Sequence, residues 1–250
     1  MVVSERGHSV DSVSRGGRAV LLDFGGVLVR FRGLEELRRL LPDRPDLDAA
    51  TRRWLGCEAV RAFERGEHRD AGLFAAQAVV QLGLPIAADE FLRRFVGWVS
   101  EPLPGAAELL ARLRRELPAG TRIGCLSNTN ALHEERILGW LGEDAFDVRF
   151  LSHRTGQVKP DRDAYTHACE TLGLEPPQVW FADDAAVNVE AALAVGLRAF
   201  RARGPGDVAR RLEQDGLLPT GSLTSRPRER VRARYARRAG SPGRPPSSRR

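Results

Sequence analysis

Short apolar runs alternate with stretches of helical spacing along most of this chain. Five runs have the length and the polar or glycine ends of buried strands: RAVLLDF (18–24), TRIGCLSN (121–128), VRFLS (148–152), QVWFADD (178–184) and LRAFRAR (197–203). Four stretches around the later runs have helical spacing: 104–117, 131–141, 161–173 and 185–196. The last of these ends at Gly196, a typical helix stop. The alternation predicts right-handed crossovers and an α/β fold with a doubly wound parallel sheet.

The segment after the first run breaks this alternation. About seventy residues there show helical spacing and no strand signal, in five stretches: 33–42, 45–56, 58–66, 70–83 and 88–99. We therefore expect a helical cap over residues 30–102, inserted after the first strand. The α/β core is expected to consist of residues 18–29 and 103–217, and residues 1–17 to form a disordered leader.

Composition and charge narrow the possible partners. The formal net charge is +6, but residues 221–250 alone hold ten Arg and one Glu. This stretch is rich in Pro, Gly and Ser, so we expect a disordered tail with at most weak contacts to nucleic acid or anionic lipid. No run of 18 apolar residues predicts a membrane helix, and the N-terminus has no apolar signal segment. Three widely spaced cysteines argue against a disulfide framework, so we expect a cytoplasmic protein.

Polar groups stand at the ends of three predicted strands. Asp23 follows the first run, Ser127 and Asn128 end the second, and Asp183 and Asp184 end the fourth. Capping of a turn or helix explains Asp23 alone, and Ser127 and Asn128 alone, equally well. Ligands of doubly wound sheets bind beyond these strand ends, where a turn before a helix suits a phosphate. Three carboxylates at one edge would repel one another without a cation, and oxygen ligands beside phosphate suit Mg2+.

One residue is exceptional in its type. Lys159, in the stretch GQVKPD, is the only lysine of a chain whose Lys and Arg total 39. An ammonium is a compact point charge, whereas a guanidinium is a wide planar fork. A pocket that holds Asp23, a phosphoryl group and a metal ion has room for the former more readily than the latter. We therefore expect Lys159 to lie in the site.

Taken in this order, the motifs resemble those of the haloacid dehalogenase (HAD) superfamily over residues 18–217. DFGGVL is similar to its first motif, LSNTN to the second, GQVKPD to the third and WFADDAAVNVEAALAVG to the fourth. A helical cap between the first two motifs is the arrangement of the first cap class. SNTNALH and FERGE resemble the bacterial subgroup of sugar-1-phosphate and flavin-mononucleotide phosphatases, which includes α-glucose-1-phosphatases.

The resemblance implies a reaction and a role for each residue of the motifs. Asp23 would attack phosphorus and form an aspartyl-phosphate, and the substrate would be a small phosphorylated metabolite. Ser127 and Asn128 would bind the phosphoryl oxygens, and Lys159 would neutralise charge. Mg2+ would be bound by Asp23, the Gly25 carbonyl, Asp183 and Asp184. Asn188 would orient the acids.

One position departs from the motif that most phosphatases of the superfamily share. A second Asp, two residues after the nucleophile, usually protonates the leaving group, and this chain has Gly25 there. General acid–base catalysis is commonly worth about 10²–10⁴-fold. We therefore expect a substrate with a good leaving group, or a proton from water or from a cap residue such as Glu67 or His68. Phe31, Trp54, Phe63, Glu64 and Arg65 are the cap residues considered for substrate contact.

Two other functions stay open at this point. A metal-independent 2-haloacid dehalogenase would use the same Asp and Lys, although the pair Asp183–Asp184 has no purpose there. A non-catalytic protein that binds a phosphorylated ligand would explain Gly25.

Overall fold

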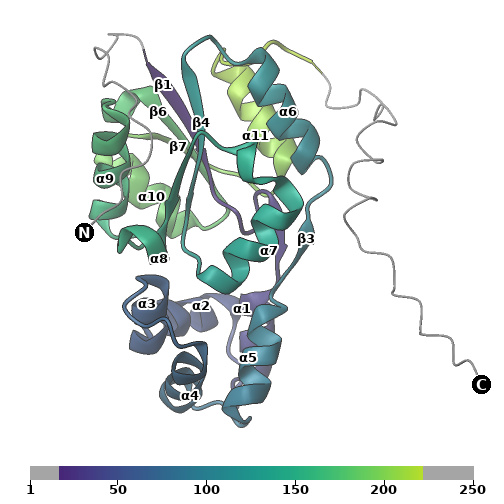
Figure 1. Ribbon diagram of the computed structural model, residues 1–250, viewed down its shortest axis with the longest axis vertical. Helices are drawn as coiled ribbons and strands as arrows, with labels where there is room; N and C mark the ends of the chain where they lie inside the picture. The colour runs from purple at the N-terminus through teal and green to yellow at the C-terminus, as the bar shows by residue number, and fades with distance from the viewer. Residues whose placement is uncertain (1–16, 222–250) are drawn as a thin grey trace, which may run out of the picture. The chain divides into compact units, whose positions relative to one another are not determined.

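The computed structural model describes residues 17–221, and its centre is a parallel sheet (Figure 1). The strand order is β5-β4-β1-β6-β7. The strands are β1 (Arg18–Leu22), β4 (Thr121–Ser127), β5 (Val148–Leu151), β6 (Val179–Asp183) and β7 (Arg198–Arg201). All five lie within the predicted apolar runs, so the predicted doubly wound α/β fold is confirmed. Gly17 and Gly221 are the only described residues of the predicted leader and tail.

The register of the sheet brings the polar strand ends to one level. Leu22 pairs with Cys125 of β4 on one side and with Ala182 of β6 on the other. Asp23 therefore lies level with the ends of both neighbouring strands, where Ser127 and Asp183 stand. After the polar residues at the start of β1 and β4, the three strands are apolar and buried until they reach this edge, where polar groups occur again.

Helices cover both faces of the sheet, α9 and α10 on one face and α6, α7 and α11 on the other (Figure 1). Their bounds are α6 (Ala106–Glu116), α7 (Ala131–Leu141), α9 (Arg162–Leu172), α10 (Ala186–Val195) and α11 (Pro205–Gln214). The first four are the predicted helices, and α10 ends at Gly196 in the left-handed conformation. The patterns did not predict α11, whose buried side is limited to Pro205, Val208, Ala209 and Leu212. They also missed three single turns: α8 (Ser152–Thr155), η1 (Glu143–Ala145) and η2 (Pro176–Gln178).

Five helices between β1 and α6 form a group with its own core, which we call the cap. They are α1 (Gly33–Leu40), α2 (Leu47–Gly56), α3 (Glu58–Glu64), α4 (Ala71–Leu82) and α5 (Ala88–Val96), and all five were predicted. Aromatic rings fill their common interior: Trp54, Phe63, Phe74, Phe91, Phe95 and Trp98. The carboxylates of Asp46 and Asp70 cap the first turns of α2 and α4.

The prediction of no strand in this segment was wrong. Two short strands, β2 (Val29–Phe31) and β3 (Val99–Pro102), pair antiparallel where the chain enters and leaves the cap. With three and four residues they are too short to show an alternating pattern, and their pairing joins positions about seventy residues apart. Across residues 17–221, no helix is long and apolar enough to cross a membrane. The three cysteines are buried and form no disulfide.

Candidate active site

Three carboxylates meet at the edge where β1 and β6 end. One oxygen atom each from Asp23, Asp183 and Asp184 lies within 4.8 Å of the others. Asp23 and Asp183 are buried, and Asp184 is half-buried beside them. The structure thus brings together the acids that the sequence placed at two separate strand ends.

The ammonium of Lys159 lies between two of these acids. Its Nζ donates hydrogen bonds to Asp23 Oδ1 at 2.9 Å, to Asp183 Oδ2 at 2.6 Å and to the Leu126 carbonyl at 2.9 Å. The side chain is 2% exposed. Burial alone would lower the pKa of Lys159, but the charges of Asp183 and Asp23 outweigh it and raise that pKa. The side chain therefore stays charged and offsets part of the negative charge of the two carboxylates.

One ammonium does not balance three acids. Burial, together with the charges of Asp23 and Asp183, raises the pKa of Asp184 to about 7. Burial also raises the pKa of Asp23, against the lowering effects of Lys159 and of the neighbouring Ser127 hydroxyl. A site with surplus negative charge and only oxygen donors fits a hard divalent cation such as Mg2+.

The two neighbouring acids of β6 differ in their hydrogen bonds. Asp183 Oδ1 accepts from the Ala185 amide at 2.8 Å and from Asn188 Nδ2 at 3.1 Å, and Oδ2 accepts from Asn188 Nδ2 at 3.0 Å and from Lys159. Each Asp183 oxygen thus has two donors. Within residues 17–221, no group donates a hydrogen bond to the Asp184 carboxylate, so its oxygens are available to a ligand.

The turn after Asp23 owes its shape to one glycine. Gly26 has φ +69°, and a Cβ atom there would lie 2.2 Å from Asp184 Oδ2. Only glycine lets the backbone pass so close to the carboxylate. Gly25, by contrast, has no left-handed backbone.

The second motif holds the third one in place. Asn128 Nδ2 donates to the Lys159 carbonyl at 2.8 Å, and Asn128 Oδ1 accepts from the Lys159 amide at 2.8 Å. This two-way bond uses the side chain of Asn128, which leaves its backbone N–H for an anion. Ser127 stands at the end of β4 with a buried hydroxyl beside Asp23. The sequence offered both the backbone N–H and the side-chain amide of Asn128 for a phosphoryl group, and it could not reveal the bond to Lys159 because the two residues are 31 positions apart.

A family model described as haloacid dehalogenase-like hydrolase matches residues 18–196. The chain belongs to this family of hydrolases. The resemblance found in the motifs is thereby confirmed.

Two curated relatives that the chain resembles are phosphatases. The plasmid-encoded phosphoglycolate phosphatase of Cupriavidus necator is 31% identical over 118 residues, which are 45% of this chain and 50% of that protein. The N-acetylmuramic acid 6-phosphate phosphatase of Pseudomonas aeruginosa is 26% identical over 199 residues, 74% of this chain and 81% of that protein. The chain thus spans half the length of the first relative and four fifths of the second.

A solved structure shares the fold. It is a HAD family enzyme from Bacteroides thetaiotaomicron in complex with magnesium and inorganic phosphate. The TM-score is 0.56 at 20% identity, over 74% of this chain and 94% of that one.

The cap meets the HAD core through the end of α3, beside α8 (Figure 1). Arg61 Nη2 donates to Asp161 Oδ2 at 2.7 Å, and Arg65 Nη2 lies 3.8 Å from the same atom. Gly66, with φ +73°, passes so close to α8 that a Cβ atom would lie 2.2 Å from the His153 carbonyl oxygen. These contacts carry no signal in the sequence, because Arg61 and Asp161 are 100 residues apart.

The cap residues expected near the substrate divide into two groups. The rings of Trp54 and Phe63 belong to the buried interior of the cap. Phe31 is 36% exposed, and its Cβ would lie 3.4 Å from a Cβ placed on Gly25, so it stands next to the site. Glu64 is half-buried, and the charges of Lys159 and Asp23 act on its carboxyl group.

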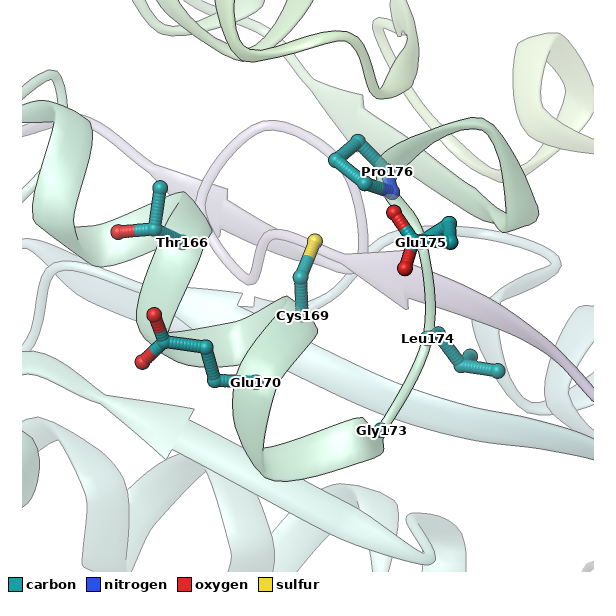
Figure 2. Close-up of a pocket in the computed structure, with 7 residues that line it drawn as sticks. All are labelled: Thr166, Cys169, Glu170, Gly173, Leu174, Glu175 and Pro176. Atoms are coloured by element: carbon teal, nitrogen blue, oxygen red, sulfur yellow. The ribbon is translucent and has the colours of Figure 1, made fainter. Parts of the chain in front are cut away.

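A surface pocket lies apart from these residues, at the end of α9 (Figure 2). It is lined by Thr166, Cys169, Glu170, Gly173, Leu174, Glu175 and Pro176. Burial and the nearby acids raise the pKa of Cys169 to about 11, so its thiol is protonated and a weak nucleophile at neutral pH. The pocket contains none of the four motifs, and we assign no chemistry to it.

Proposed function

We propose that this hydrolase is a Mg2+-dependent phosphatase that cleaves a small phosphate monoester through an aspartyl-phosphate on Asp23. The observation that carries the proposal is the buried Lys159 ammonium, bonded to both Asp23 and Asp183 with a third carboxylate beside them. The phosphatase activity of the two relatives supports the same reaction. The substrate we expect is a small phosphorylated metabolite of the cytoplasm.

Asp23 acts as the nucleophile in this proposal. Its carboxylate is held by Lys159 and Ser127, which leaves it oriented at the open edge of the sheet. Attack on phosphorus forms the aspartyl-phosphate and releases the alcohol, and water then hydrolyses this intermediate. Lys159, the Ser127 hydroxyl and the Asn128 backbone N–H stabilise the charge of the phosphoryl oxygens.

The metal-binding roles follow from which oxygens are free. Asp23, Asp184 and the Gly25 carbonyl would hold Mg2+, whose charge, when bound, neutralises the phosphoryl group. Asp183 has both oxygens engaged, so we assign it to positioning Lys159, and to the metal at most through water. Asn188 orients Asp183 through its two hydrogen bonds.

The cap has the role of selecting the leaving group. We propose that residues 30–102 close one side of the site, with Phe31 and Glu64 nearest to the part of the substrate that departs. The core, formed by residues 18–29 and 103–217, carries all residues assigned to phosphate and metal.

Hydrolysis of p-nitrophenyl phosphate by the full chain tests the proposal. We expect turnover with Mg2+, its loss in EDTA, and a drop of about 10³-fold or more in Asp23→Asn. Equal rates in wild type and Asp23→Asn would instead favour a binding protein. Release of chloride from a 2-haloacid in EDTA would identify a dehalogenase.

A further inference from the structure

The first motif has no side-chain acid for the leaving group. Gly25 occupies the position two residues after Asp23, where a second carboxyl group would reach the departing oxygen. Its backbone is not left-handed, and a Cβ there would lie 3.4 Å from Phe31 Cβ and 3.8 Å from Asp23 Oδ2. These are close but ordinary contacts, so the fold tolerates a side chain at this position. Because Gly25 itself has no side chain, another residue must supply the acid. The part of the cap that lies near the site is the place where such a residue is expected.

One face of α3 is held against the third motif. Arg61 and Arg65 are four residues apart and both reach Asp161, which lies two residues after Lys159. Residues three apart share a helix face, so Glu64, three residues after Arg61, lies on the face that Arg61 turns toward the core. The close passage of Gly66 along the His153 carbonyl fixes the turn that follows.

Glu64 has the surroundings of a functional carboxyl group. The Trp54 side chain lies beside its carboxyl group, and the charges of Lys159, Arg61 and Asp23 act on it. Burial raises the pKa of Glu64 to about 7, against the lowering effects of Trp54, Lys159 and Arg61. A carboxyl group in this range can both give and take a proton near neutral pH.

We propose that Glu64 is the general acid and base of the reaction and replaces the carboxyl group that Gly25 lacks. The inference rests on the proposed phosphatase function and names the residue that serves the leaving group. It puts Glu64 in the place of Glu67 and His68, the cap residues expected from the sequence; Glu67 is exposed and lies 3.8 Å from Arg65 Nη1.

The proton balance is closed by one residue. As the bond from Asp23 to phosphorus forms and the ester P–O bond breaks, the Glu64 proton passes to the leaving oxygen and the alcohol departs. The Glu64 carboxylate then takes a proton from water while the water oxygen attacks phosphorus. The bond from phosphorus to Asp23 breaks, inorganic phosphate leaves, and Glu64 is again protonated.

Two aryl esters of similar shape test this role, because they differ in how much the leaving group needs a proton. For Glu64→Gln we expect kcat/KM for phenyl phosphate to fall about 10²–10⁴-fold. With p-nitrophenyl phosphate, whose leaving group is weakly basic, the fall should be less than about tenfold. Glu58→Gln, the same change at an exposed position of α3, is the matched control and should leave both rates unchanged.

A rescue variant separates acid catalysis from damage to the cap. Adding Gly25→Asp to Glu64→Gln supplies the carboxyl group from the first motif, and we expect phenyl phosphate turnover to rise at least tenfold over Glu64→Gln. No rise, an equal loss with both esters, or a selective loss in Glu67→Gln would overturn the inference.

Asp23→Asn separates a failure of the Glu64 role from a failure of the proposed phosphatase function. If that variant is inactive while Glu64→Gln matches wild type on phenyl phosphate, only the role of Glu64 falls; if Asp23→Asn is fully active, the proposed function falls with it.

Discussion

The surroundings of Lys159 explain why this position holds a lysine and not an arginine. Its amine meets two carboxylates and a carbonyl within 2.9 Å in a space that leaves the side chain 2% exposed. A guanidinium is wider and has its donors in a plane, so it cannot direct three bonds from a single atom. The absence of any other lysine made this position visible in the sequence.

Lys159→Arg should therefore lose activity and stability although it keeps the positive charge. We expect a loss of at least about 100-fold in phosphatase activity, because the fork displaces Asp23, and a loss of about 3 kcal/mol in the free energy of unfolding. Arg93→Lys, on the exposed side of α5, is the control and should change stability by less than about 0.5 kcal/mol. Wild-type activity and melting temperature in Lys159→Arg would contradict this account of the site.

Other residues show what a sequence does not reveal. The chemistry of Asn128 and Asp183 indicated phosphate and metal; in the structure the Asn128 side chain bonds the Lys159 backbone, and Asp183 bonds Lys159 Nζ, Asn188 and the Ala185 amide. Hydrogen-bond partners 24 and 31 residues away decide these roles, and no local pattern records them. The type of a polar residue at a strand end was thus predictable, while the atom that it contacts was not.

At the scale of helices and strands, the elements with a long apolar pattern were predicted from the sequence, and those without one were missed. Strands and helices with a long apolar pattern were all recognised, because burial repeats along them. β2 and β3 are too short to repeat, and α11 begins with Pro and Gly and carries four charged residues and one Gln among its ten. Such elements form because the tertiary structure provides partners for them.

His133 joins two of these elements and gives the fold a dependence on pH. This residue in the first turn of α7 has its Nε2 2.8 Å from the Phe95 carbonyl of α5 and its Nδ1 3.2 Å from Asn130 Nδ2. Since the Asn130 oxygen caps the helix, its amide group donates to Nδ1, and a proton there would face another donor. Burial, with a smaller effect of Arg136, lowers the pKa of His133 to about 4.

The sign of the effect follows from this lowered pKa. Between about pH 6.5 and pH 4, the unfolded chain binds a proton at His133 that the folded chain does not, so stability falls as the pH falls. Urea unfolding should show that, between pH 7 and pH 4.5, the free energy of unfolding falls by about 2–3 kcal/mol more in the wild type than in His133→Gln. Glutamine is the chosen replacement because its side chain can still donate a hydrogen bond to the Phe95 carbonyl. Above pH 7 the two curves should run parallel. If the stability of the two proteins changed in parallel over the whole pH range, His133 would not be the source of the pH dependence.

At the scale of the whole molecule, the site was predictable because parallel strands end at a common edge. Asp23 and Asp183 are 160 residues apart, yet the register of β1 and β6 alone brings them level. The meeting of cap and core was not predictable in the same way. It depends on single contacts, such as Arg61 with Asp161, that follow no repeating pattern.

The central claim is that this edge of the sheet places Asp23 in line with a phosphoryl group and makes its carboxylate the nucleophile. Rapid acid quenching during turnover of p-nitrophenyl phosphate with Mg2+, followed by mass spectrometry of the peptide that contains Asp23, tests it most directly. We predict one phosphoryl group on Asp23 during turnover and none after the ester is exhausted. Steady hydrolysis by a protein whose Asp23 never carries phosphate would contradict the account.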